Sequence, residues 1–370
     1  MTTVKKKITT NTRVIKDLLT RYKDTFSALC ELINNSLQAS STEVNITIDY
    51  SNGISKSPVN NIVIKDNGNG VPYSDFERKI LEIGTTVKEG GQGIGRFGAL
   101  QIGESMKIET VAYDEKEKAF SKVKFLLQAE EIQDSQFNEI EFKIDYDYFK
   151  EENLNTYYQV SITNLYHGGQ VKISRKNKIV ESFLSKNIKQ ALFEKYPLEI
   201  FHKGIKFKVN EELLQKEDFV IGKPCIKKEV YTDKKGIAQD MSFYFYNVTA
   251  NLNKVKVFFQ IDNAGLKTVA HEYTYPSDWY TPDLGTWFIY VDSPLFNSDL
   301  FRNIDIESLG FDEIKNLREF IKTQINEFFK AKNRKFENFL TRLEKDKAYP
   351  YRDNKAASNT QEILLKRLPI

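Results

Sequence analysis

Apolar residues recur at three- and four-residue spacing between Val14 and Ile33, which is the period of one face of an α-helix. This pattern predicts a helix over residues 13–39. Apolar and polar residues then alternate over 44–50 and 61–65, as they do in strands with one buried face. The chain therefore opens with a helix and a strand pair, and the second strand ends directly at Asp66.

The remaining pattern mixes short helices with many strands. A short helix is predicted over 76–83, a polar, glycine-rich loop over 85–95 and a helix over 97–102. Strands are predicted over 106–113, 119–127, 139–144, 158–163, 205–209, 226–232, 241–249, 255–262 and 287–291. Between the fourth and fifth of these strands lie a linker near 166–175 and an amphipathic helix over 180–193, and a long helix follows the last from about 311 to 343.

Helices combined with antiparallel strands favour an α+β fold over a parallel βαβ fold. The chain of 370 residues is long enough for two or three domains. The predicted organisation is a first domain at 1–170 with an N-terminal arm, a second domain at 171–310, a long C-terminal helix at 311–345 and a polar, basic tail at 346–370.

Composition narrows the class of protein. The net charge of +3 is too small to indicate polyanion binding by itself. Residues 328–370 carry eleven Lys and Arg against five Asp and Glu, which suits either contact with nucleic acid or a solvated helix face. The chain has only two cysteines and no run of eighteen apolar residues. We therefore expect a cytoplasmic protein without a disulfide framework or a membrane span.

Three polar residues share one face of the first predicted helix. Glu31, Asn35 and Gln38 lie four and three residues apart, so their side chains point the same way. Glu31 is a candidate general base that orients a water molecule against a phosphate. Asn35 offers a neutral oxygen to Mg²⁺, a hard ion that binds through few protein groups plus phosphates. Taken alone, these residues are equally consistent with a solvated helix face.

The segment DNGNG at residues 66–70 follows a strand. Its simplest interpretation is a tight turn in which glycines supply positive φ. It is also suited to ligand recognition, because Asp66 would accept a hydrogen bond from the exocyclic amine of adenine. Gly68 and Gly70 would let the base approach the backbone, and Val71 directly follows them.

The segment GIGRFG at residues 93–98 matches the pattern G-x-G-x-x-G. A dinucleotide fold requires a strand immediately before this motif, whereas a polar loop containing Thr86 precedes it here. The segment instead predicts a mobile, glycine-rich lid that ends at a helix N-terminus, where free N–H groups suit phosphate. The P-loop pattern G-x-x-x-x-G-K-[ST] occurs nowhere in the chain.

In this order, the three segments resemble the motifs of the GHKL (Bergerat-fold, Hsp90-like) ATPases. In their amino-acid sequence, residues 26–36 and 94–100 are most similar to the MORC and MutL branches. The resemblance implies an ATPase α/β sandwich with ATP and Mg²⁺ as ligands, Glu31 as the catalytic base and Asn35 as the metal ligand. The nucleotide-binding residues that it implies are Asn35, Gln38, Asp66, Gly68, Gly70, Val71, Thr86, Gly93, Ile94, Gly95, Arg96, Phe97 and Gly98.

The chain departs from the family pattern at two positions on the first helix. Gln38 stands three residues after the metal-binding asparagine, where an acid is expected, and Asn34 replaces the acid before it. Both changes make the site less negative, so we expect weaker Mg²⁺ binding and slow hydrolysis. A threonine that many members carry near the last strand has no assignable equivalent in residues 157–161.

The second domain resembles the transducer domain of gyrase, MutL and MORC proteins in its order of elements. In those families a cation of this domain reaches the γ-phosphate and stabilises developing charge. Arg302 is the first candidate and Lys267 the second. Each is equally consistent with an ordinary surface cation.

The resemblance implies a clamp that forms a homodimer on binding ATP and acts on DNA, with genome defence against viruses as a further expectation. Two alternatives remain open: a protein-remodelling chaperone of the heat-shock type, and a slow ATP-dependent switch that recruits an effector protein. Residues 362–370 keep apolar character, so a missing C-terminal domain is a further expectation.

Overall fold

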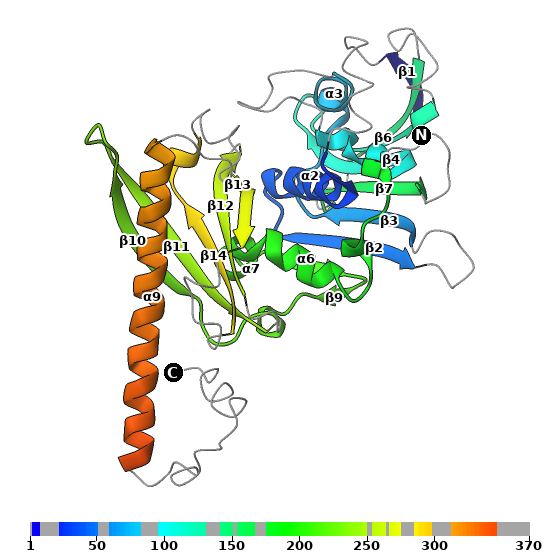
Figure 1. Cartoon of the computed structure of the whole chain (residues 1–370). Coiled ribbons are helices and arrows are strands. Elements are labelled where there is room, and N and C mark those ends of the chain that lie inside the picture. The colour runs from blue at the N-terminus through cyan, green and yellow to red at the C-terminus, as the bar shows by residue number, and fades with distance from the viewer. Residues whose placement is uncertain are drawn as a thin grey trace. The chain divides into compact units, whose positions relative to one another are not determined.

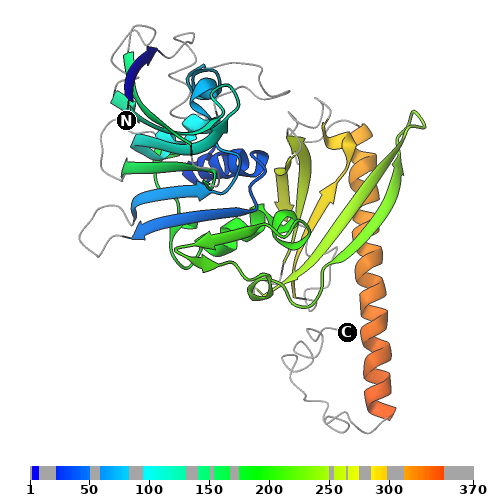
Figure 2. The same cartoon turned by 180° about the vertical axis from the view of Figure 1, so that it is seen from behind.

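The computed structural model describes residues 2–7, 22–50, 59–82, 95–130, 141–150, 154–166, 175–249, 254–263, 266–274, 285–297 and 312–345. The chain divides into two compact units (Figures 1 and 2). The first comprises Met1–Leu214 with Asn263–Leu266, and the second comprises Gln215–Asp262 with Lys267–Ile370.

The first unit is built on a nine-stranded sheet in the order β1-β6-β5-β4-β7-β3-β2-β8-β9. Its strands are β1 (Thr2–Lys7), β2 (Glu43–Tyr50), β3 (Val59–Asp66), β4 (Gly103–Asp114), β5 (Ala119–Gln128), β6 (Glu141–Phe149), β7 (Tyr157–Leu165), β8 (Lys206–Val209) and β9 (Glu212–Leu213). The described pairings are antiparallel except that of β2 with β8, which is parallel.

Side chains alternate between buried and more exposed positions along β2 and β5, as expected for a sheet with one face against a core. Helices of the first unit lie on that buried side (Figure 1). They are α2 (Thr25–Gln38), α3 (Tyr73–Phe76), α4 (Ala99–Ile102), α6 (Ile188–Lys195) and α7 (Pro197–Phe201). This arrangement confirms the predicted α/β sandwich.

The long polar-faced helix α2 begins at a defined cap. The side chain of Asp24 accepts a hydrogen bond from the backbone N–H of Ser27, which satisfies one of the free donors at a helix start. The described helix therefore starts at Thr25, later than the periodic pattern from residue 13 suggested. Residues 13–21 lie outside the described part of the chain.

The first unit extends beyond the predicted boundary at residue 170. Residues 175–213, which we call the extension, include α6, α7, β8 and β9. Phe207 and Val209 of β8 are buried where this strand continues the sheet beside β2. The unit therefore ends after Leu214, because the core on α2 and β2 is completed only by the extension.

The second unit contains a five-stranded sheet in the order β10-β11-β14-β12-β13. The strands are β10 (Cys225–Thr232), β11 (Ala238–Val248), β12 (Val255–Asn263), β13 (Leu266–Thr274) and β14 (Thr286–Asp292). Helix α9 (Asp312–Lys345) packs Leu317, Ile321 and Ile325 into an aromatic-rich core that includes Trp287. This unit confirms the predicted α+β class and the long C-terminal helix.

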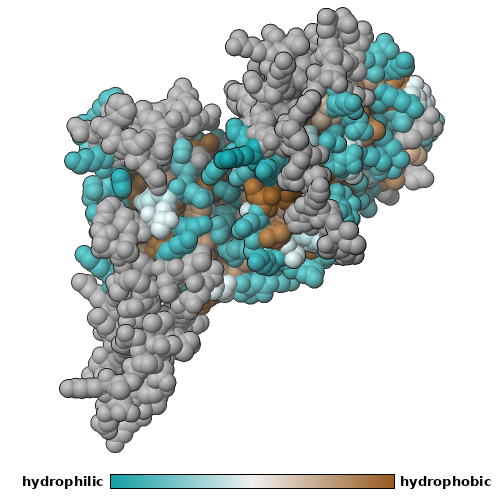
Figure 3. Space-filling view, turned by 45° about the vertical axis from the view of Figure 1, so that its right-hand side comes forward, coloured by the Kyte–Doolittle hydropathy of each residue, from teal (hydrophilic) through white to brown (hydrophobic). Residues whose placement is uncertain are grey.

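Among the described residues, no helix is long and apolar enough to cross a membrane. On the face shown in Figure 3, hydrophilic residues cover most of the described surface, and the hydrophobic residues in view form limited areas.

Candidate functional site

The polar face of α2 meets the end of the predicted lid. Glu31 and Asn35 are half-buried. A Cβ atom placed on Gly95 would lie 3.5 Å from Oε2 of Glu31 and 3.6 Å from Nδ2 of Asn35. The chain thus brings together the candidate base, the candidate metal ligand and a lid glycine, as the motifs predicted. Gln38 lies two turns along the same helix from Glu31 and is also half-buried.

The lid is fixed to α2 at its C-terminal end. A Cβ atom on Gly98 would lie 3.1 Å from the carbonyl oxygen of Ala28 and 3.2 Å from the ring of Tyr22. Phe97 beside it is buried. A larger residue than glycine at 98 would therefore push this turn away from the helix. Thr86, Gly93 and Ile94 lie outside the described residues.

Arg96 has a different role from its lid neighbours. Its Nε donates to the carbonyl oxygen of Ile80 at 2.8 Å and its Nη2 to that of Glu82 at 2.6 Å. Burial lowers the pKa of the guanidinium to about 10, so the group stays charged at neutral pH. In this conformation the side chain binds the C-terminal end of the helical turn Glu77–Leu81, and the sequence motif alone did not indicate that contact.

Asp66 occupies the end of β3 and is only 3% exposed. Oδ1 accepts a hydrogen bond from the backbone N–H of Gly68 at 2.9 Å. Burial raises the pKa of this carboxyl, while hydrogen bonds with the Ser36 hydroxyl and the Tyr158 and Gly68 backbones act in the opposite direction. The carboxylate is therefore held in one orientation by groups from α2, β7 and its own loop.

Tyr158 lies opposite Asp66 in the β3–β7 pairing. Its hydroxyl is buried and has no hydrogen-bond partner in the part of the chain that the structure describes. Burial raises the pKa of Tyr158, and the charges of Arg96 and Asp66 both act on it, so the hydroxyl carries its proton. A buried donor without a partner is costly, and a bound polar ligand beside Asp66 would satisfy it.

The loop after Asp66 is anchored by a threonine that sequence reasoning missed. Oγ1 of Thr110 accepts from the backbone N–H of Val71 at 2.9 Å and donates to the carbonyl oxygen of Tyr157 at 3.0 Å. Thr110 is fully buried in β4. The available signal was the alternation along β4: Thr110 stands in the same register as the buried apolar residues Met106, Ile108 and Ala112, and a buried hydroxyl needs partners.

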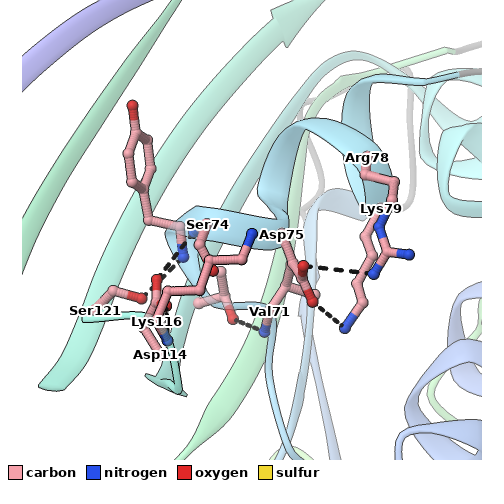
Figure 4. Close-up of polar contacts among 10 residues, drawn as sticks. Val71, Ser74, Asp75, Arg78, Lys79, Asp114, Lys116 and Ser121 are labelled. Carbon is pink, nitrogen blue, oxygen red and sulfur yellow. Dashed lines mark hydrogen bonds and ion pairs between the residues drawn. The ribbon is translucent and has the colours of Figure 1, made fainter. Parts of the chain in front are cut away.

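The chain after Val71 is held in the same way (Figure 4). The backbone N–H of Tyr73 donates to Oγ of Ser121 at 3.0 Å, and that of Ser74 donates to Oδ2 of Asp114 at 3.0 Å. Free N–H groups at the start of α3 therefore have side-chain acceptors from β4 and β5. The Asp66 loop is fixed at both ends.

Gly70 is required by its conformation and by its surroundings. Its φ is +64°, and a Cβ atom would lie 2.4 Å from the carbonyl oxygen of Val111. Gly204, in the same unit, has a similar φ of +67° but no atom within 4 Å of the same position. We expect Gly70→Ala to lower the free energy of unfolding by about 3 kcal/mol, from left-handed strain plus overpacking.

Gly204→Ala is the matched control, since it carries only the conformational cost of about 1 kcal/mol. Urea unfolding of both variants, followed by circular dichroism, measures the difference. Equal losses would show that the loop relaxes to accept the added methyl group.

The structure describes one of the two candidate cations of the second unit, Lys267. Nζ of Lys267 lies 3.0 Å from Oδ1 of Asp292 and 3.8 Å from Oδ2 of Asp262. In this conformation Lys267 is therefore paired with two carboxylates of its own unit. Arg302 lies outside the described residues.

Within the described residues, no three His, Cys, Asp or Glu side chains are grouped so that they could hold a metal ion. The candidate metal ligand, Asn35, stands beside one carboxylate, Glu31. This donor set fits a magnesium ion that takes most of its oxygens from phosphates and water.

Comparison with known proteins agrees with the motifs. Residues 22–156 match the family model described as "Histidine kinase-, DNA gyrase B-, and HSP90-like ATPase". No curated protein matches the chain. Among solved structures, the fold is similar to the "Crystal Structure of N terminal domain of a DNA repair protein", with a TM-score of 0.50 and 13% identity over 86% of this chain and 98% of that chain.

At that level of identity the solved structure shows a shared fold alone. The family model covers the helix with Glu31 and Asn35, the loop at Asp66 and the glycine-rich segment. Residues 22–156 therefore form a domain of the histidine kinase-, DNA gyrase B- and HSP90-like ATPase family, which confirms the GHKL resemblance.

Proposed function

We propose that the chain is an ATP-hydrolysing molecular clamp of the GHKL type. The observation that carries this proposal is the approach of Gly95 to both Glu31 and Asn35. A glycine-rich backbone segment this close to a candidate base and a candidate metal ligand supports the proposal. The held carboxylate of Asp66 and the buried hydroxyl of Tyr158 add acceptor and donor groups that suit the edge of an adenine ring.

In the proposed reaction, Glu31 accepts a proton from the water that attacks the γ-phosphate. Asn35 would hold Mg²⁺ through its amide oxygen, and the ion would neutralise phosphate charge. The lid glycines offer backbone N–H groups to the phosphates. Because Gln38 and Asn34 are neutral, the site holds one acidic side chain on this face of α2, and we expect slow turnover.

The clamp part of the proposal concerns the N-terminal strand. Strand β1 pairs antiparallel with β6, from Thr2 opposite Tyr146 to Lys7 opposite Glu141. Lys6 forms an ion pair with Glu77 at 2.8 Å, and both side chains are more than one-third exposed. Exposed pairs of this kind contribute little, about 0–1 kcal/mol. Strand β1 lies at the edge of the sheet with β6 as its partner, so exchange with the corresponding strand of a second copy would break pairing on one side only.

We further propose that the clamp acts on DNA and serves in genome defence. Two observations favour DNA as the substrate: the similarity to a structure titled as a DNA repair protein, and the basic tail. A polypeptide client and a recruited effector protein, on a missing C-terminal domain or a separate chain, are the alternatives. A steep loss of DNA affinity between low and high salt would favour the first, because phosphate contacts release counterions.

We expect nucleotide binding to double the molecular mass of the protein in solution, because the proposed clamp is a dimer. Light scattering should show a monomer without nucleotide and a dimer with Mg²⁺ and a non-hydrolysable ATP analogue. A chain lacking residues 1–7 should bind the analogue equally tightly in calorimetry but remain monomeric. A full chain that binds the analogue and stays monomeric contradicts the clamp, and a chain that does not bind the analogue contradicts the ATP site.

A further inference from the structure

A tyrosine of the extension lies under the candidate base. Tyr196 joins α6 to α7 and is only 2% exposed. Its hydroxyl lies 2.9 Å from the carbonyl oxygen of Cys30 and 3.0 Å from Oδ1 of Asn34. Its ring stacks on Phe207 of β8, with centroids 5.2 Å apart. Packing therefore fixes where the hydroxyl points.

Asn34 connects this hydroxyl to Glu31. It is buried, and Nδ2 donates to Oε1 of Glu31 at 3.4 Å. An amide has one donor end and one acceptor end. With Tyr196 donating to its oxygen, the amide must present its nitrogen to Glu31. A flipped amide would place its oxygen against the carboxylate and leave the phenol O–H without this acceptor.

The phenol keeps the single proton that it shares between the carbonyl oxygen of Cys30 and Oδ1 of Asn34. Burial raises the pKa of Tyr196 well above its ordinary value, and the charges of Glu31 and Glu199 act in the same direction. The hydroxyl therefore keeps its proton throughout the pH range in which proteins function. The titratable groups whose charges act on Cys30 or Tyr196 here are Asp24, Glu31, Lys195 and Glu199, together with Cys30 and Tyr196 themselves.

We propose that Tyr196 and Asn34 are positioning residues for the catalytic base: the Tyr196 hydroxyl sets the orientation of the Asn34 amide, and the amide holds the Glu31 carboxylate aimed at the attacking water. The inference rests on the proposed ATPase function. It gives the extension, which lies beyond the residues that match the family model, a direct part in the site.

The test compares two tyrosine variants that each lose one hydrogen-bonded hydroxyl. In Tyr196→Phe we expect kcat for ATP to fall on the order of tenfold, because the base is no longer held in line, with the Kd for ATP unchanged. Tyr50→Phe is the control. Its hydroxyl donates to the carbonyl oxygen of Phe183 at 3.1 Å in the same unit, so we expect kcat to stay at the unaltered value.

Asn34→Leu supplies a second readout. This side chain has nearly the size of asparagine but cannot donate to Glu31, so kcat should fall by a similar factor while the Kd for ATP stays unchanged. Equal kcat in the two tyrosine variants, or an unchanged kcat in Asn34→Leu, overturns the inference. If Tyr196→Phe does not fold, Asn34→Leu decides.

The inference and the proposed function fail in different ways. Absence of turnover in the unaltered chain refutes the ATPase function, and the inference falls with it. Normal turnover in the unaltered chain, with Tyr196→Phe as active as Tyr50→Phe, refutes the inference alone.

Discussion

Glu31→Gln should abolish measurable turnover, with a fall in kcat of at least about a hundredfold, the usual range for loss of a general base. Binding of ATP should remain, because the amide has nearly the shape of the carboxylate and the Asp66 loop keeps its contacts. Single-turnover hydrolysis of labelled ATP measures the first quantity, and calorimetry with a non-hydrolysable analogue measures the second.

Ser27→Ala provides the comparison for this variant. It changes another half-buried polar side chain on the same helix, without removing a group able to accept the proton. We expect its kcat to lie within a few-fold of the unaltered value. Full activity in Glu31→Gln would refute Glu31 as the base and, with it, the role assigned to Asn34.

Asp66→Asn should lower ATP affinity on the order of a hundredfold. The carboxylate accepts from Gly68 and is a partner of Ser36, so its orientation toward a ligand is fixed. In asparagine an amide NH2 group replaces one carboxylate oxygen, so a hydrogen-bond donor would face the adenine amine, which needs an acceptor. A lost hydrogen bond to a charged group costs about 1.5–3 kcal/mol. Calorimetric titration with the ATP analogue measures this loss.

The same residue predicts how binding depends on pH. Burial raises the pKa of Asp66 in the folded protein, so protonation begins at a higher pH than for an ordinary aspartate. As the pH is lowered, the ATP affinity of the unaltered chain should therefore begin to fall at a higher pH than it would if this carboxylate were exposed. In Asp66→Asn this dependence should be absent.

Loss of the fold cannot explain the expected loss of binding. A raised carboxyl pKa means that the ionised form opposes folding, and that this cost grows as the pH rises through the folded pKa. Asp66→Asn should therefore be at least as stable at neutral pH. Asp75→Asn is the control: Asp75 pairs with Lys79 at 2.9 Å, and its loss should leave affinity unchanged. Equal weakening in both variants would contradict the role of Asp66.

The sequence predicted those parts of the fold that depend on local pattern. Strands β2 and β3 lie close to the alternating segments, and Asp66 ends β3 as expected. The approach of Gly95 to Glu31 agrees with the order of the motifs. These features are set by periodicity and by residue types with specific chemistry, both of which are visible in a single sequence.

Long-range pairing explains what the sequence did not predict. Nothing local to β8 indicates that it pairs with β2, so the boundary was placed at 170 and the unit ends after Leu214. Tyr196 was missed for the same reason, because its partner Asn34 lies far away along the chain. Arg96 belongs to a motif, but its direction depends on the carbonyl groups of Ile80 and Glu82.

The parallel pairing of β2 with β8 also constrains the order of folding during synthesis. Glu43 of β2 pairs with Lys206 of β8, and contacts between segments so far apart form slowly because a large loop must close first. A nascent chain that has emerged only through β7 would display the free edge of β2. The base would also lack the hydroxyl of Tyr196. On the proposed function, the site therefore becomes complete only after the ribosome has released the segment beyond the ATPase motifs.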